Sequence, residues 1–181
     1  MAKSLYPLLL TPVSRANEPS AQLLGDFLET DEPLDPTDAS EVWQAVDCGD
    51  LQTVVANGEF AGQSLRQLVQ ARPEELVGRR HAPESPFPLA TRILDVGADQ
   101  PWQVHPDKYL KVDSETFPPN AKFWFSLAAR RNSNIVAGIA PGVTGQQLLS
   151  QLNKPGLTRL LRTMPAREGD AYLIPPGMLH S

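Results

Sequence analysis

Two short motifs that contain histidine are the parts of this sequence whose residue types suit metal chemistry. The first is Gln103-Val104-His105-Pro106, and the second is Pro176-Gly177-Met178-Leu179-His180. On a β-strand, side chains two positions apart point to the same face, so Gln103 and His105 are expected to face one side together. His180, on a second strand that follows the turn at Gly169-Asp170, is expected to close a metal site against this pair.

The alternative is that His105 and His180 are solvent-facing or hydrogen-bonded histidines that bind no metal. The chain has three histidines. The third, His81, lies between Arg79-Arg80 and Ala82-Pro83, and this context indicates a solvated loop residue.

Composition narrows the class of protein that can hold such a site. The chain has 181 residues, 41% of them hydrophobic and 20% charged, which suits one globular domain with a real core. Eighteen prolines and twelve glycines are scattered along it, which favours short strands joined by turns. The net charge of −5 argues against a nucleic-acid-binding surface. Cys48 is the single cysteine, so an intrachain disulfide and a thiolate zinc site are excluded, and a cytoplasmic location is expected.

The sequence gives no sign of membrane insertion. No stretch approaches the length of a membrane span. The apolar run Leu8-Leu9-Leu10 is interrupted by Pro7 and Pro12, so it is expected to form a strand rather than a signal peptide.

Hydrophobic periodicity predicts a mainly β protein, a β-sandwich or open barrel with short helical insertions. Ser64 is expected to cap one helix, and Thr144 with Gln147 forms a capping box in front of a helical insertion over about 144–163. An N-terminal strand and an acidic, proline-rich loop are expected over residues 1–40, before a domain over 41–181. Strands are predicted over residues 41–46, 87–96 (mostly buried), 102–105, 123–127, 134–139 and 171–175, and loops over 30–40 and 106–121.

Seven motifs in a fixed order resemble those of one enzyme family. They are Glu41-Val42-Trp43, Gly62 to Leu68, Phe87-Pro88-Leu89 with Ile93-Leu94-Asp95, Gln103 to Pro106, Gly138 with Pro141 to Thr144, Gly169-Asp170, and Pro176 to His180. This order resembles class I mannose-6-phosphate isomerase, a zinc-dependent cupin. The resemblance implies a cupin-like jelly-roll β-sandwich that interconverts mannose 6-phosphate and fructose 6-phosphate, with a small sugar phosphate as its partner.

The resemblance also implies which residues would bind one zinc ion. Gln103, His105 and His180 fall on three of the family's ligands, whereas the family's fourth ligand, a glutamate, falls on Lys122. A serine that the family associates with substrate phosphate falls on Pro101. The family's last strand and its later catalytic arginine would lie beyond residue 181, so the cupin is expected to be C-terminally incomplete, as in a truncated reading frame. No general base is identified.

Lys122 is expected to weaken or abolish zinc binding if it faces the site. A unit positive charge about 4 Å from another costs on the order of 4 kcal/mol at an effective dielectric constant of about 20, and a dication doubles this cost. Glu115 and Asp107 are the acids that could compensate. A second hypothesis is therefore a catalytically degraded cupin that acts as a sugar-phosphate-binding or regulatory module, and a third is a cupin that acts on another small substrate.

Overall fold

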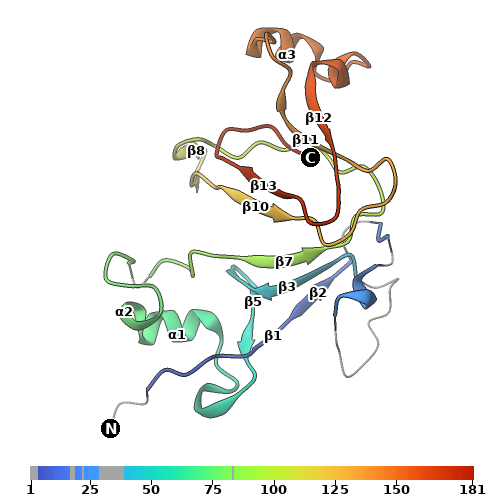
Figure 1. Cartoon of the computed structure of the whole chain (residues 1–181). Coiled ribbons are helices and arrows are strands. Elements are labelled where there is room, and N and C mark those ends of the chain that lie inside the picture. The colour runs from blue at the N-terminus through green and yellow to red at the C-terminus, as the bar shows by residue number, and fades with distance from the viewer. Residues whose placement is uncertain (1–3, 17–18, 22, 29–38, 83) are drawn as a thin grey trace. The chain divides into compact units, whose positions relative to one another are not determined.

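The structure is a computed structural model that describes residues 4–16, 19–21, 23–28, 39–82 and 84–181. The chain divides into two compact units, Met1–Ala98 and Asp99–Ser181 (Figure 1). The domain boundary predicted after residue 40 stays a prediction. Residues 30–38 of the predicted acidic loop lie outside the described residues.

An antiparallel three-stranded sheet forms the centre of the first unit. Strand β3 (Glu41–Ala45) lies between β2 (Val13–Arg15) and β7 (Thr91–Leu94). The strand predicted over 41–46 is thus confirmed. The prediction of a mostly buried strand over 87–96 is wrong, because the strand covers only Thr91–Leu94 and is mostly exposed. It lies at the edge of the sheet and pairs on one side only, and Pro88 has no N–H group with which to extend the ladder.

The first unit also contains four strands of two residues each. The sequence predicted only one of them, at the run Leu8 to Leu10, and of that run only Leu10 lies in a strand. Strand β1 (Leu10–Thr11) pairs with β6 (Val54–Val55), and β4 (Asp47–Cys48) pairs with β5 (Leu51–Gln52). Strands of two residues are too short to show an alternating pattern. The short 3₁₀ helices are η1 (Leu24–Asp26) and η2 (Gly58–Phe60).

The predicted helix cap at Ser64 is confirmed. Helix α1 (Leu65–Ala71) begins with a capping box, in which the Gln67 amide donates to Ser64 Oγ (3.2 Å) and the Ser64 amide donates to Gln67 Oε1 (2.8 Å). Its buried face carries Leu65, Leu68 and Val69. Leu68 packs with Val55 and Phe60 in the core of this unit. Helix α2 (Pro73–Leu76) adds one further turn.

The second unit consists mainly of three antiparallel strand pairs. Strand β10 (Lys122–Phe125) pairs with β13 (Ala171–Ile174), and β11 (Asn134–Ile139) pairs with β12 (Leu161–Pro165). These bounds agree with the predicted strands near 123–127, 134–139 and 171–175, whereas β12 was not predicted. The Thr144–Gln147 capping box is also confirmed, at the start of α3 (Gly145–Gln151). The insertion near 144–163 also contains the 3₁₀ helix η3 (Leu157–Leu160).

Two predictions in this unit are wrong. Residues 106–121 are not a single loop, because β8 (Leu110–Val112) and β9 (Glu115–Phe117) form a hairpin there. Residues 102–105 form no regular strand, because Gln103 contributes only an isolated bridge to His180. Pro101 and Pro106 flank this segment and have no N–H groups to donate to a longer ladder.

The fold that results is mainly β with a few short helices, as predicted. Within the described ranges, no helix has both the length and the apolar character that a bilayer crossing requires.

Candidate functional site

The backbone brings the two histidine motifs together within the second unit. The Gln103 amide donates to the His180 carbonyl (2.9 Å), and the His180 amide donates to the Gln103 carbonyl (2.8 Å). Two residues that exchange both hydrogen bonds lie directly opposite each other, so their side chains lie on the same face. The Gly177 amide also donates to the His105 carbonyl (2.8 Å), which holds the second motif along the whole of the first.

The same C-terminal segment is held on its other side by β11. The Gly138 amide donates to the Leu179 carbonyl (2.7 Å), and Val136 and Ser181 exchange hydrogen bonds of 2.8 and 3.0 Å. His180 therefore lies between two partners, and only 2% of its surface is exposed. Backbone pairing on both sides fixes the direction of its side chain.

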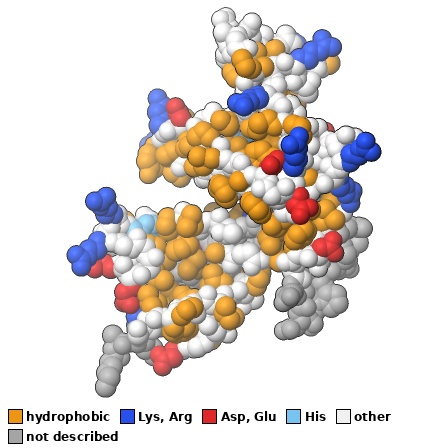
Figure 2. Space-filling model, viewed as in Figure 1, with side chains coloured by type: hydrophobic (Ala, Val, Ile, Leu, Met, Phe, Trp, Pro, Cys, Tyr) orange, Lys and Arg blue, Asp and Glu red, His pale blue; other side chains and the backbone are white. Residues whose placement is uncertain are grey.

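Strand β10 adds Lys122 and Trp124 to this site. Side chains alternate along the strand, so Lys122 and Trp124 share one face while Phe123 and Phe125 point to the other and are exposed. Figure 2 shows hydrophobic side chains gathered over β10 and β13, consistent with this outward-facing set. On the inner face, the Trp124 ring lies edge-on to His180, with ring centroids 5.5 Å apart.

The two imidazoles lie side by side, and both present an unused nitrogen. The rings of His105 and His180 have centroids 5.3 Å apart and planes inclined by 26°. Nδ1 of His180 lies 2.8 Å from the Met178 carbonyl oxygen, which can only accept, so Nδ1 carries the proton and Nε2 keeps a lone pair. Within the described part of the chain, Nε2 of His105 and Nε2 of His180 are buried without a hydrogen-bond partner.

Burial and the charge of Lys122 keep these imidazoles neutral. Burial lowers the pKa of His105 below its ordinary value of 6.5, and the positive charge of Lys122 and the neighbouring His180 lower it further. Burial is also the main cause that lowers the pKa of His180. The hydrogen bond to Met178 opposes that shift, whereas Lys122 adds to it. Both pKa values fall because protonation would place a cation in a poorly solvated site beside another cation.

Three of the four predicted positions offer groups that suit a divalent metal, and the fourth does not. The amide oxygen of Gln103 and the imidazole rings of His105 and His180 are neutral groups of the kinds that bind zinc in proteins. Lys122 Nζ lies 3.4 Å from Gln103 Oε1, so the lysine faces this site. An ammonium group repels a dication, and no donor of the set is negatively charged. The set as it stands does not fit a zinc ion.

Neither proposed compensating acid completes the site with the two histidines. Among the residues that the structure describes, no group of three or more His, Cys, Asp or Glu side chains could hold a metal ion. Glu115 lies on the exposed strand β9. Asp107 instead lies next to Gly177. A Cβ atom added to Gly177 would lie 3.1 Å from the Cβ of Asp107, so this close approach and the positive φ of Gly177 (+82°) both favour glycine.

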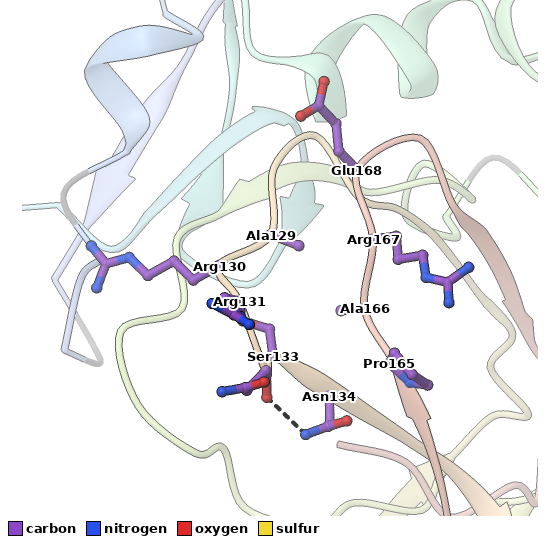
Figure 3. A pocket seen from close by; sticks show the side chains of 10 residues that line it. Ala129, Arg130, Arg131, Ser133, Asn134, Pro165, Ala166, Arg167 and Glu168 are labelled. Atoms are coloured by element: carbon purple, nitrogen blue, oxygen red, sulfur yellow. Dashed lines mark hydrogen bonds between the residues drawn. The ribbon is translucent and has the colours of Figure 1, made fainter.

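The arginine pair Arg130-Arg131 lines a separate hollow of about 500 Å³ in the second unit. Arg167 and Glu168 lie across it, on the turn before β13. Figure 3 shows the guanidinium groups of Arg130, Arg131 and Arg167 extending in different directions rather than toward one point. Phosphate recognition needs converging donors, so this arrangement favours solvated turns over a phosphate site.

Sequence reasoning missed two parts of the site. One is Trp124, whose ring contacts His180, and its position two residues after Lys122 on a strand could have indicated this. The Met178 carbonyl, which sets the tautomer of His180, gives no signal in the sequence because every residue has a carbonyl group.

Comparison with known proteins gives relatives of one kind. The chain is 27% identical over 176 residues to mannose-6-phosphate isomerase ManA of Bacillus subtilis, a match that covers 97% of this chain and 54% of that protein. It is 30% identical over 129 residues to mannose-6-phosphate isomerase of Streptococcus mutans, covering 71% of this chain and 40% of that protein. No family model matches the chain.

A solved structure agrees with these sequence matches. The crystal structure of the mannose 6-phosphate isomerase from Bacillus subtilis superposes with a TM-score of 0.77 at 25% identity, over 96% of this chain and 54% of that one. The mainly β fold, with glutamine and two histidines at one site, is that of a cupin-like protein. The chain is a homologue of the mannose-6-phosphate isomerases, and it spans about half the length of the curated relatives it matches.

Proposed function

We propose that the protein acts on a hexose 6-phosphate as an aldose–ketose isomerase, interconverting mannose 6-phosphate and fructose 6-phosphate. The observation that carries this proposal is the convergence of Gln103, His105 and His180 in a homologue of that enzyme family. The location that goes with this proposal is the cytoplasm.

The reaction moves a proton between C1 and C2 of the sugar through an enediol. It therefore needs a base that is unprotonated near neutral pH and a positive or hydrogen-bonding group near the oxygen that gains charge. The lone pair at Nε2 of His180 supplies an acceptor, and the lowered pKa values of His105 and His180 favour their unprotonated forms. Lys122 and the Gln103 side-chain amide supply donors next to them.

Zinc is the cofactor that the family resemblance implies, with Gln103, His105 and His180 as its protein ligands. The acid–base roles of the histidines and of Lys122 do not depend on zinc, and the charge of Lys122 does not suit a dication. Metal dependence is therefore tested together with activity.

The test is an isomerase assay on the full 181-residue chain, with mannose 6-phosphate as substrate, in the presence and absence of added zinc. We expect turnover that His180→Ala reduces by about 100-fold or more, as is usual when an acid–base group is lost. His81→Gln changes a histidine of the other unit and is the matched control. Turnover that His180→Ala leaves unchanged would contradict the assignment of this site.

The second candidate function is a sugar-phosphate-binding module without catalysis, and one observation favours it. Lys122 Nζ faces Gln103 Oε1 at 3.4 Å, where the resemblance puts a metal-binding acid. Thermal unfolding measured with mannose 6-phosphate and with free mannose separates the two functions. A midpoint raised only by the phosphate ester, without turnover, supports the binding module. An unchanged midpoint without turnover contradicts both functions.

A further inference from the structure

The candidate site already contains a positive charge, and that charge belongs to the protein. Lys122 Nζ lies 3.4 Å from Gln103 Oε1. It is also close enough to both imidazoles for its charge to lower their pKa values. Lys122 thus contacts one of the three side chains that would ligate a metal, and its charge adds to the effect of burial on the other two.

The sheet sets the face from which the side chain of Lys122 starts. Lys122 lies opposite Ile174 in the β10–β13 register, and Ile174 is 2% exposed. Directly opposite residues share a face, so Lys122 starts from the inner face of this strand pair. For Lys122 to lie on the same face as Phe123 and Phe125, the whole strand would have to shift its pairing by one residue.

We propose that the ammonium group of Lys122 takes the place of the metal ion in this cupin-like site, so that Gln103, His105 and His180 surround a lysine instead of a divalent cation. Two observations carry the inference independently of the family resemblance. One is the Lys122–Gln103 contact. The other is the pair of buried Nε2 atoms without hydrogen-bond partners, one of them on a histidine that is 98% buried.

The inference deepens the proposed function, because it names the cation of the same site. A site with a fixed ammonium and two neutral imidazoles attracts an oxygen that carries negative charge or gains it. Its ligand class is therefore an oxyanion or a polarised carbonyl group of a sugar phosphate. Divalent metal ions are disfavoured, because like charges repel strongly where solvent is partly excluded.

The decisive experiment measures zinc affinity rather than activity. The full chain and its variants are equilibrated in zinc buffers at pH 7, and bound metal is counted by elemental analysis and titrated by calorimetry. We expect less than stoichiometric zinc in the unmutated chain, and one zinc ion in Lys122→Glu with an affinity at least ~1,000-fold higher. Lys111→Glu, which makes the same charge change on exposed strand β8, is the control and should match the unmutated chain.

A second variant keeps the test decisive if Lys122→Glu does not fold. Lys122→Met removes the charge at similar length, and it should bind zinc more tightly than the unmutated chain but less tightly than Lys122→Glu. Cobalt added to either variant should give a visible absorption band that the further substitution His180→Ala abolishes.

Two results would overturn the proposal. One is stoichiometric zinc in the unmutated chain with an affinity within tenfold of that of Lys122→Glu. The other is a folded Lys122→Met that binds zinc no more tightly than the unmutated chain. Metal affinity is the readout, so a chain without isomerase activity can still pass this test. Failure of the lysine proposal is therefore distinguishable from failure of the isomerase proposal.

Discussion

Nδ1 of His180 lies 2.8 Å from the carbonyl oxygen of Met178, two residues earlier in the same segment. This contact makes Nδ1 the donor and leaves the lone pair on Nε2, which is buried. The chemistry of the site depends on that tautomer, because a protonated Nε2 could neither accept a proton nor bind a metal.

Protein stability is predicted to fall as the pH drops below about 6.5. The pKa values of His105 and His180 are lowered in the folded chain, so between the folded and unfolded values the unfolded chain binds more protons. Acid therefore favours unfolding in that window, and above pH 6.5 this contribution to stability is complete. Urea unfolding at pH 5, 6 and 7.5 measures the effect. In His105→Gln the decline should be smaller, whereas a pH-independent midpoint would contradict the prediction.

Removing the charge of Lys122 is predicted to raise the pKa of both histidines. Lys122 lowers both values through its positive charge, although burial is the larger cause in each, so the rise should be partial. NMR titration of the imidazole resonances in Lys122→Met measures it. Lys111→Met, which removes an equivalent charge from exposed strand β8, is the control and should leave the two titration curves in place. Unchanged curves in Lys122→Met would place its ammonium away from the rings.

Two neighbouring residues of β13 are predicted to differ sharply in their importance for stability. Ile174 is 2% exposed and Leu173 is 70% exposed. Ile174→Ala should lower the free energy of unfolding by about 2–5 kcal/mol, because it leaves a cavity as well as losing apolar burial. Leu173→Ala should change it by less than about 0.5 kcal/mol. Urea unfolding followed by circular dichroism compares them, and equal effects would mean that the strand faces are assigned wrongly.

Asp95 is predicted to anchor the first unit through hydrogen bonds to a distant segment. Its buried carboxylate accepts from Ser20 Oγ (2.6 Å) and from the amides of Ala21 (3.0 Å) and Leu23 (2.9 Å). Asp95→Ala should destabilise the unit by about 1–3 kcal/mol, since it leaves buried amides unsatisfied. Urea unfolding measures this loss. Asp50→Ala, at an exposed position of the same unit, provides the comparison, and an equally small effect of both substitutions would refute the anchoring role.

Local signals in the sequence predicted much of the fold. Both helix caps were predicted from local residues, one from Ser64 and the other from the spacing of Thr144 and Gln147, and strand β11 was predicted with its observed bounds. These signals act within one turn or one strand, so they do not depend on the rest of the chain. The hairpin β8–β9 and strand β12 were missed because their short segments show no clear period, and it is pairing with a partner strand that makes them β structure.

The sequence by itself determined which residues could form the site, namely Gln103, His105, Lys122 and His180. Tertiary structure decided what they form together. The pairing of Gln103 with His180, and of β10 with β13, brings Lys122 Nζ to 3.4 Å from Gln103 Oε1. The spacing of residues along a chain fixes which side chains share a strand face, but only long-range backbone pairing fixes which faces meet. For that reason the sequence could name a lysine at the fourth position, and the folded structure was needed to show that this lysine points into the site.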